Sequence, residues 1–306
     1  MPPRPAGQRT DHFPAAPCAV GPWRRGPRVR YASVGGAGVM TSPMRSSFDD
    51  IARSAALWPI WARLGLQDVR LKFRRSAIGP AWIFINLAIL VVSIGFIYAN
   101  LLGQEPRQFI PYLTIGMILW AYLTNSIIDG GNAFVHSEGY IKQISLPIYV
   151  YLFRFFISIT ATMLITMCAF VIVAVLYRLP VGLGTLLAVP GLLMLMATSL
   201  LLIAIFAHLN ARFRDVAHLA SVAMQVLFYV TPVIFPAHLL QNRGRLAWIV
   251  ELNPMFHLLE VVRRPLLSNS AAEWHSYLVA VGIIAVLGTV SMVLVRVYGR
   301  RIVFAL

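Results

Sequence analysis

Charged residues, lysine and cysteine are scarce in this chain of 306 residues, and each scarcity excludes a class of protein. Charged side chains make up 12% of the sequence and hydrophobic residues 58%, whereas soluble domains have about 25% and about 45–50%. The two cysteines, Cys18 and Cys168, are far apart, so we expect neither a disulfide framework nor a cysteine-bound metal. This composition is typical of a protein whose main surroundings are apolar.

Catalytic and nucleotide-binding motifs are also missing from the sequence. The two lysines, Lys72 and Lys142, stand outside any glycine-rich phosphate-binding loop, and no zinc-protease, dithiol or nucleophile-elbow motif occurs. The seven histidines are scattered, which favours structural or solvated roles over metal binding. We therefore expect no catalytic residue, no metal and no cofactor in this chain.

Long apolar runs fill the chain from residue 78 onward. Each has roughly the 17 to 25 or more residues that a helix needs to cross about 30 Å of hydrocarbon. The predicted fold is an all-α integral membrane protein with six transmembrane helices within residues 78–306. The absence of carboxylates inside the runs disfavours ion-coupled carriers and membrane-embedded enzymes that use paired carboxylates. The six runs are 78–102, 109–128, 149–176, 183–208, 217–235 and 276–295.

The net charge of +15 is placed mostly outside these runs. Basic residues beside apolar runs report topology rather than a nucleic-acid surface, so we expect no nucleic-acid partner. If both termini are cytoplasmic, eleven basic residues near the runs face the cytoplasm and six face outside. The prediction is a multi-pass protein with both termini in the cytoplasm.

The first 77 residues divide into two segments of different composition. Residues 1–50 are rich in Pro, Gly, Ala, Ser and Arg and lack the apolar core of a secretory signal, so we expect a disordered extension, with Met40 or Met44 as an alternative start. Residues 51–77 are expected to form an amphipathic interface helix in the lipid headgroup layer or against a soluble partner. Its apolar face carries Trp58, Ala62, Leu66, Val69 and Phe73, and its polar face carries Arg63, Gln67, Arg70 and Arg74.

The connection between the second and third runs contains a short amphipathic piece. Tyr140, Ile141 and Ile144 stand beside Glu138 and Lys142, and a proline ends the piece. It either docks into a groove on a soluble partner or is an ordinary solvated connection. Gly130 and Gly131, just before it, are expected to loosen the end of the second run.

A second short segment precedes the last run. Asn253 is expected to cap a helix that begins at Pro254. The helix is too short to span a bilayer, so we expect an outside gate or re-entrant segment. Glu260 is expected to pair with Arg263 or Arg264.

Two further features of the runs have alternative interpretations. Arg154 is the one basic residue inside a run, and it either extends towards the headgroups or contacts a headgroup or partner. Aromatic residues are either interfacial anchors or the lining of an uncharged conduit for sugars. The candidates for the conduit are Phe96, Tyr98, Trp120 and Tyr122.

Three sequence motifs carry a resemblance to a known family over about residues 57–306. The chain resembles the membrane subunits of type-2 ABC exporters, and in particular the permeases that export O-antigen, capsular, teichoic-acid or cell-wall galactan chains. The motifs are Asp68-Val-Arg70-Leu-Lys72-Phe-Arg74-Arg75-Ser76-x-Ile78-Gly79-Pro80-x-Trp82, then Ile144-Ser-Leu146-Pro147, and Asn253-Pro254-Met255.

The resemblance implies an assembly in a bacterial cytoplasmic membrane. Two copies of this chain would pair with two copies of a separate ATPase subunit, which binds ATP and Mg²⁺. The cargo would be a polyisoprenyl-diphosphate-linked glycan; a drug or small-lipid exporter of the same superfamily is the alternative.

The resemblance also implies roles for particular residues. The coupling helix that contacts the ATPase would contain Glu138, Gly139, Tyr140, Ile141, Lys142, Leu146 and Pro147. The interface or gate helix would use Trp58, Trp61, Asp68 and Phe73, and the outside gate Asn253, Pro254, Met255 and Phe256. The diphosphate, or alternatively anionic lipid headgroups, would be met by Arg70, Lys72, Arg74 and Arg75.

Overall fold

A computed structural model describes residues 47–74, 76–144, 146–237, 239 and 247–299. Apart from Ser47–Asp50, the predicted extension 1–50 lies outside the described residues, as does Arg75. The described residues form helices joined by short connections. In chain order the helices are α1 (Ser47–Ala56), α2 (Trp58–Phe73), α3 (Ala81–Leu102), α4 (Pro106–Ile128), η1 (Gly130–Asn132), α5 (Ala133–His136), α6 (Glu138–Gln143), α7 (Tyr149–Leu176), η2 (Leu183–Leu187), α8 (Ala188–Arg212), α9 (Asp215–Val230), α11 (Ala247–Glu251), α12 (Pro254–Ser268) and α13 (Trp274–Tyr298).

Five helical segments in the described part of the chain are long and apolar enough to cross a membrane. They are Ala81–Leu101, Pro106–Gln143, Tyr149–Leu176, Leu183–Arg212 and Trp274–Tyr298. These segments correspond to five of the six predicted runs, and the first is shorter than its run by three residues at the start and one at the end. The all-helical membrane fold expected from the sequence is therefore confirmed.

The remaining predicted run, 217–235, overlaps helix α9 (Asp215–Val230), which is shorter than expected. Helix α9 has 16 residues, which is about 24 Å of helix at 1.5 Å per residue. It ends because Thr231 takes an extended conformation, with φ −83° and ψ 137°, as expected for a residue that precedes a proline. Residues 231–235 then form turns rather than helix.

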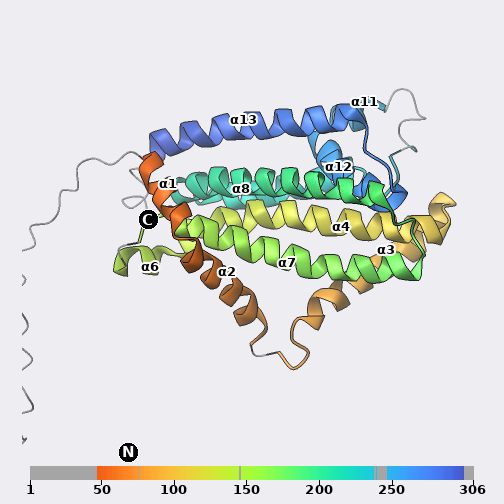
Figure 1. Cartoon of the computed structure of the whole chain (residues 1–306), viewed down its shortest axis with the longest axis horizontal. Helices are drawn as coiled ribbons and strands as arrows, with labels where there is room; N and C mark the ends of the chain where they lie inside the picture. The colour runs from red at the N-terminus through yellow and green to blue at the C-terminus, as the bar shows by residue number, and fades with distance from the viewer. Residues whose placement is uncertain (1–46, 75, 145, 238, 240–246, 300–306) are drawn as a thin grey trace, which may run out of the picture. The chain divides into compact units, whose positions relative to one another are not determined.

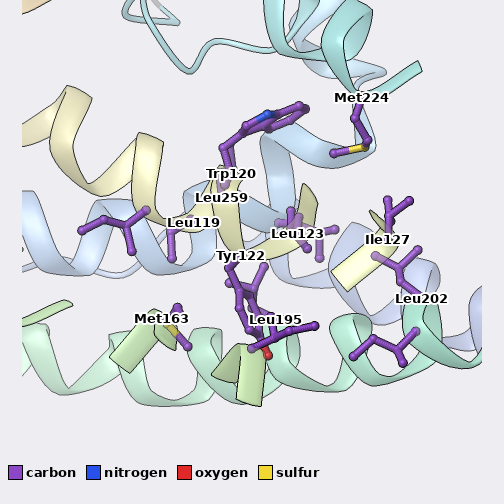
Figure 2. Packing of buried hydrophobic residues seen from close by; sticks show 14 of the residues in the cluster. Leu119, Trp120, Tyr122, Leu123, Ile127, Met163, Leu195, Leu202, Met224 and Leu259 are labelled. Atoms are coloured by element: carbon purple, nitrogen blue, oxygen red, sulfur yellow. The ribbon is translucent and has the colours of Figure 1, made fainter. Parts of the chain in front are cut away.

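Helix α4 lies at the centre of the bundle. It packs against α3, α7, α8, α9 and α12, and α4, α7, α8 and α13 run side by side (Figure 1). Its buried side chains include Leu113, Leu119 and Leu123, which are fully shielded from solvent. Figure 2 shows Leu119, Trp120, Tyr122 and Leu123 of α4 among Met163 of α7, Leu195 and Leu202 of α8, Met224 of α9 and Leu259 of α12.

The two glycines after α4 hold helices close together rather than loosening the chain. A Cβ on Gly130 would lie 2.5 Å from Cγ1 of Ile203, and one on Gly131 would lie 2.8 Å from Cβ of Phe206. The backbone stays helical through this region, first as η1 and then as α5. The predicted loosening is therefore wrong, because the missing side chains allow α8 to approach an intact helical path.

Candidate coupling site and outer gate

Helix α2 lies directly against α7. A Cβ on Gly65 would meet the carbonyl oxygen of Arg154 at 2.6 Å, so the two backbones approach as closely as a glycine permits. One turn before Gly65, the ring of Trp61 stacks on Phe153 with centroids 5.3 Å apart, and its Nε1 donates to the carbonyl of Ser54 at 3.0 Å. These contacts fix α1, α2 and the start of α7 as one unit.

The predicted apolar face of α2 is only partly covered by α7, and its contact with the headgroup layer or a soluble partner stays a prediction. Gly65 and Val69 are buried, but Trp58 is 63% exposed and Leu66 48% exposed. The apolar residues of α2 occur on most of its circumference, so their spacing did not reveal which side packs. The glycine decides this, because it is the point of closest approach to α7.

Arg154 and Asp68 join α7 to α2 through a bidentate ion pair. The Arg154 guanidinium donates from Nε to Oδ2 and from Nη2 to Oδ1 of Asp68, both at 2.6 Å. The two side chains are only 16% and 20% exposed. Paired charged hydrogen bonds of this geometry are stronger than neutral ones and fix orientation. Arg154 therefore pairs with Asp68 of the same chain, a contact that neither alternative from the sequence included.

Arg154 also contacts the segment that precedes α7. Its Cζ lies 5.5 Å from the centroid of the Tyr140 ring on α6, within the range of a cation–π contact. A cavity of about 140 Å³ lies between α2, α7 and the segment that contains α6. It is lined by Tyr140, Tyr151, Arg154 and residues of α2. The Tyr151 hydroxyl is buried and has no hydrogen-bond partner among the described residues. We call Asp68, Tyr140, Tyr151 and Arg154 the inner cluster.

Helix α6 projects from one end of the bundle (Figure 1). It has no buried residue, and Tyr140 and Ile144 are 52% and 47% exposed. Lys142 Nζ donates to Glu138 Oε1 at 2.6 Å, which holds the pKa of that carboxyl below its usual range. A Cβ on Gly139 would meet nothing within 4 Å. Exposed apolar and charged side chains on one short helix are available to a partner.

The basic residues that are predicted to contact the diphosphate or lipid headgroups lie beside the inner cluster. Arg70, Lys72 and Arg74 are exposed at the end of α2. Lys72 also lines a second cavity of about 360 Å³, together with Asp129, His136 and Arg154. This cavity is large enough for a small polar group, and it adjoins the Asp68–Arg154 pair.

At the other end of the bundle, Asn253 caps α12 as predicted. Its Oδ1 accepts from the amides of Met255 at 2.9 Å and Phe256 at 3.4 Å, and its Nδ2 donates to Thr231 at 2.9 Å. The cap therefore connects α12 to the end of α9.

Helix α12 enters the bundle from one end. Its first residues, Pro254 and Met255, lie beside Thr198 in the middle of α8. The residue after its last turn, Asn269, accepts a hydrogen bond at 2.9 Å from the amide of Thr185 in η2, which directly precedes α8. The helix thus lies along the half of α8 that is nearer η2.

A buried arginine of α12 contacts both α4 and the turn after α9. The Arg263 side chain is 1% exposed, and its Nη1 donates to the Tyr112 hydroxyl at 2.7 Å and to the carbonyl of Pro232 at 2.9 Å. The guanidinium lies over the Tyr112 ring, 4.1 Å from its centroid. Gly116 makes room for it, since a Cβ there would lie within clashing distance of Nη2. We call Tyr112, Gly116, Pro232 and Arg263 the outer latch.

The outer latch replaces the ion pair that the sequence suggested. Among the described residues Glu260 forms no ion pair, and Arg264 pairs with Glu273 at 2.8 Å instead. The expected Glu260–Arg263 or Glu260–Arg264 pair is wrong, because α12 turns Arg263 inward. No local signal in the sequence could reveal the latch, since Tyr112 and Arg263 are 151 residues apart.

The four aromatic candidates for a conduit do not come together in a single chain. Trp120 and Tyr122 are buried in the main core (Figure 2). Trp120 packs on Phe228, and the Tyr122 hydroxyl lies 3.0 Å from that of Thr160. Phe96 of α3 is 73% exposed, and Tyr98 packs on a separate small cluster.

Known proteins match most of this region. A family model described as ABC-2 type transporter matches residues 62–267, which include the inner cluster and the outer latch. The O-antigen export system permease protein RfbA of Myxococcus xanthus is 22% identical over 194 residues, which are 63% of this chain and 74% of that protein. The protein of the same name from Klebsiella pneumoniae is 21% identical over 194 residues, with 62% and 73% covered.

Proposed function

This chain belongs to the ABC-2 type transporter family, and we propose that it is the transmembrane permease subunit of an ATP-driven exporter that moves a polysaccharide across the bacterial cytoplasmic membrane. Its relatives named as O-antigen export permeases support the polysaccharide cargo. The structural observation that carries the proposal is the exposed helix α6, which contacts α2 through Arg154. An exposed helix that is linked to the membrane helices suits a subunit whose conformational change is driven by a bound partner.

The proposed topology has six crossings with both termini in the cytoplasm. Five are the long apolar segments, and the sixth is α9 extended by the turn 231–235. In this arrangement α6 and the inner cluster face the cytoplasm, and α12 re-enters the membrane from outside. Its buried position against α8 and α4 supports this, because irregular backbone at membrane depth needs protein around it.

The proposed mechanism begins at α6. Two copies of this chain bind two copies of an ATPase subunit, and α6 of each permease copy sits in a cleft of an ATPase. ATP and Mg²⁺ act on that partner subunit. When ATP closes the ATPase dimer, a shift of Tyr140 reaches Arg154 and then Asp68, so that α2 and α7 move together. ATP thereby favours the conducting state over the closed state of the membrane helices.

The proposed cargo is a polyisoprenyl-diphosphate-linked glycan. Its diphosphate would meet Arg70, Lys72, Arg74 and Arg75 at the cytoplasmic end of α2, since basic side chains fit phosphate oxygens. Anionic lipid headgroups are the competing ligand for the same charges. The cavity beside Lys72 is compatible with either phosphate source.

One observation keeps a small-lipid or drug exporter as a second candidate. Trp120 and Tyr122 are buried in the core of the chain, so an aromatic conduit is not formed within one copy. The aromatic residues of a single copy therefore do not decide between polysaccharide export and small-lipid export.

The test is depletion of the permease in its native bacterium, followed by quantification of lipid-linked glycan on the cytoplasmic face of the membrane. Accumulation there is expected. An unchanged glycan level together with increased sensitivity to a lipophilic drug would favour the second candidate instead.

A further inference from the structure

A polar pocket of about 680 Å³ lies beside the outer latch, at the end of the bundle opposite α6. Four parts of the chain form it: the start of α4 with the turn before it, the end of α7, Pro236 and Ala237 after α9, and the middle and end of α12. Ligand sites in proteins commonly measure about 300–1,000 Å³. The pocket is therefore large enough for one or two sugar rings.

The formal charges of the side chains that line the pocket sum to zero. Arg107 and Arg178 contribute two positive charges, while Glu105 and Glu260 contribute two carboxylates. The amide of Gln108 is also present, and amides and carboxylates suit hydroxyl groups that both donate and accept hydrogen bonds. A phosphate would meet the two carboxylates as well as the two arginines, so a neutral, hydroxyl-rich ligand fits better.

Aromatic rings accompany these polar groups. Tyr112 and Tyr177 both line the pocket. The apolar face of a pyranose can stack on such rings while its hydroxyls reach the polar side chains around them. The combination is that of a carbohydrate site rather than an apolar lipid groove.

Arg178 occupies a position in which glycine is usual. Helix α7 ends in a left-handed turn, in which Leu179 donates its amide to Ala174 at 2.9 Å and Arg178 donates its own to Val175 at 3.2 Å. Arg178 has φ of +52° in this turn. Glycine is the preferred residue at this point of such a turn because it has no Cβ. The sequence places a long, cationic side chain there, and that side chain lines the pocket.

We propose that this outer pocket binds a neutral pyranose unit of the exported chain as it leaves the permease. The inference rests on the proposed function for the origin of the sugar, but the pocket itself is defined by this chain alone. Because Tyr112 lines the pocket and also holds Arg263, an occupant would lie against the outer latch.

Saturation-transfer difference NMR tests the proposal on the purified full chain in lipid nanodiscs free of glycoside detergent. The probes are the methyl pyranosides of glucose, galactose, mannose and rhamnose. At least one is expected to give a signal from the wild type. Binding should be about tenfold weaker in Arg178→Gly and in Glu260→Leu, each of which removes a charged hydrogen-bonding group.

The choice of variants separates loss of the pocket from misfolding. Arg178→Gly is expected to keep the backbone turn, since glycine tolerates positive φ. The control variant Arg264→Gln removes a cation of α12 that does not line the pocket, and it should bind as the wild type does. No signal from any pyranoside, equal signals in wild type and pocket variants, or binding of pyrophosphate instead would overturn the proposal. If pyranoside binding is intact while depletion leaves the lipid-linked glycan unchanged, the pocket stands and the proposed export function fails.

Discussion

Arg154 of α7 and Asp68 of α2 face each other in two parallel hydrogen bonds of 2.6 Å, although 86 residues separate them in the chain. The same guanidinium lies near the ring of Tyr140 on α6. One side chain thus contacts two elements that the proposed mechanism must move together. The first prediction follows from this geometry.

Arg154→Lys is expected to reduce export at least about tenfold, because an ammonium cannot form the bidentate pair. Asp68→Asn should have a similar effect, and the double variant should be less impaired than the sum of the two, by about 1–3 kcal/mol in a double-mutant cycle. Co-purification with the ATPase should remain at the wild-type level. Loss of ATPase binding in Arg154→Lys would contradict the proposed transmission role.

The surface of α6 gives a second prediction. Tyr140→Ala and Glu138→Ala should weaken association with the ATPase in pull-down experiments, since both side chains belong to an exposed helix without buried residues. Membrane insertion should be unchanged. Trp274→Ala provides the control, because Trp274 is also exposed but begins α13 at the opposite end of the bundle. Equal ATPase binding by all three variants would argue against α6 as the contact.

The close approach at Gly65 predicts a cost for any added side chain. Gly65→Ala would place a methyl group against the Arg154 carbonyl and Ile157, so α2 must move away from α7. We expect a loss of about 1–3 kcal/mol in the free energy of unfolding, as for other overpacked contacts. Gly288→Ala on α13 is the matched control, because nothing lies within 4 Å of its added Cβ. Thermal unfolding in nanodiscs should lower the melting temperature of the first variant alone.

The outer latch predicts different effects on stability for two substitutions. Tyr112→Phe removes the oxygen that accepts from Arg263 and should destabilise the protein by about 1–3 kcal/mol, because a buried charge loses a partner. Arg263→Met removes that charge altogether and should be neutral or stabilising. Denaturation of both variants checks this, and a strong loss of stability in Arg263→Met would show that the latch is a structural requirement.

The sequence predicted the local features of the molecule well. The apolar runs correspond to helices and Asn253 caps α12, because each of these features depends on neighbouring residues. It could not predict which face of α2 packs, since that depends on where Gly65 meets α7. The ion pair of Arg154 and the latch of Arg263 depend on partners far away in the chain.

The helical path from Pro106 to Gln143, which is interrupted by turns at Asp129 and Ser137, has a mechanical consequence. Tyr112 stands near one end of this path and Tyr140 near the other, while the middle is clamped on several sides by α7, α8 and α9. We expect a displacement of Tyr140 to pass through α5 and η1 into α4. A single event at the ATPase would then be felt at Tyr112 as well, so the two ends of the bundle would respond in a coordinated way.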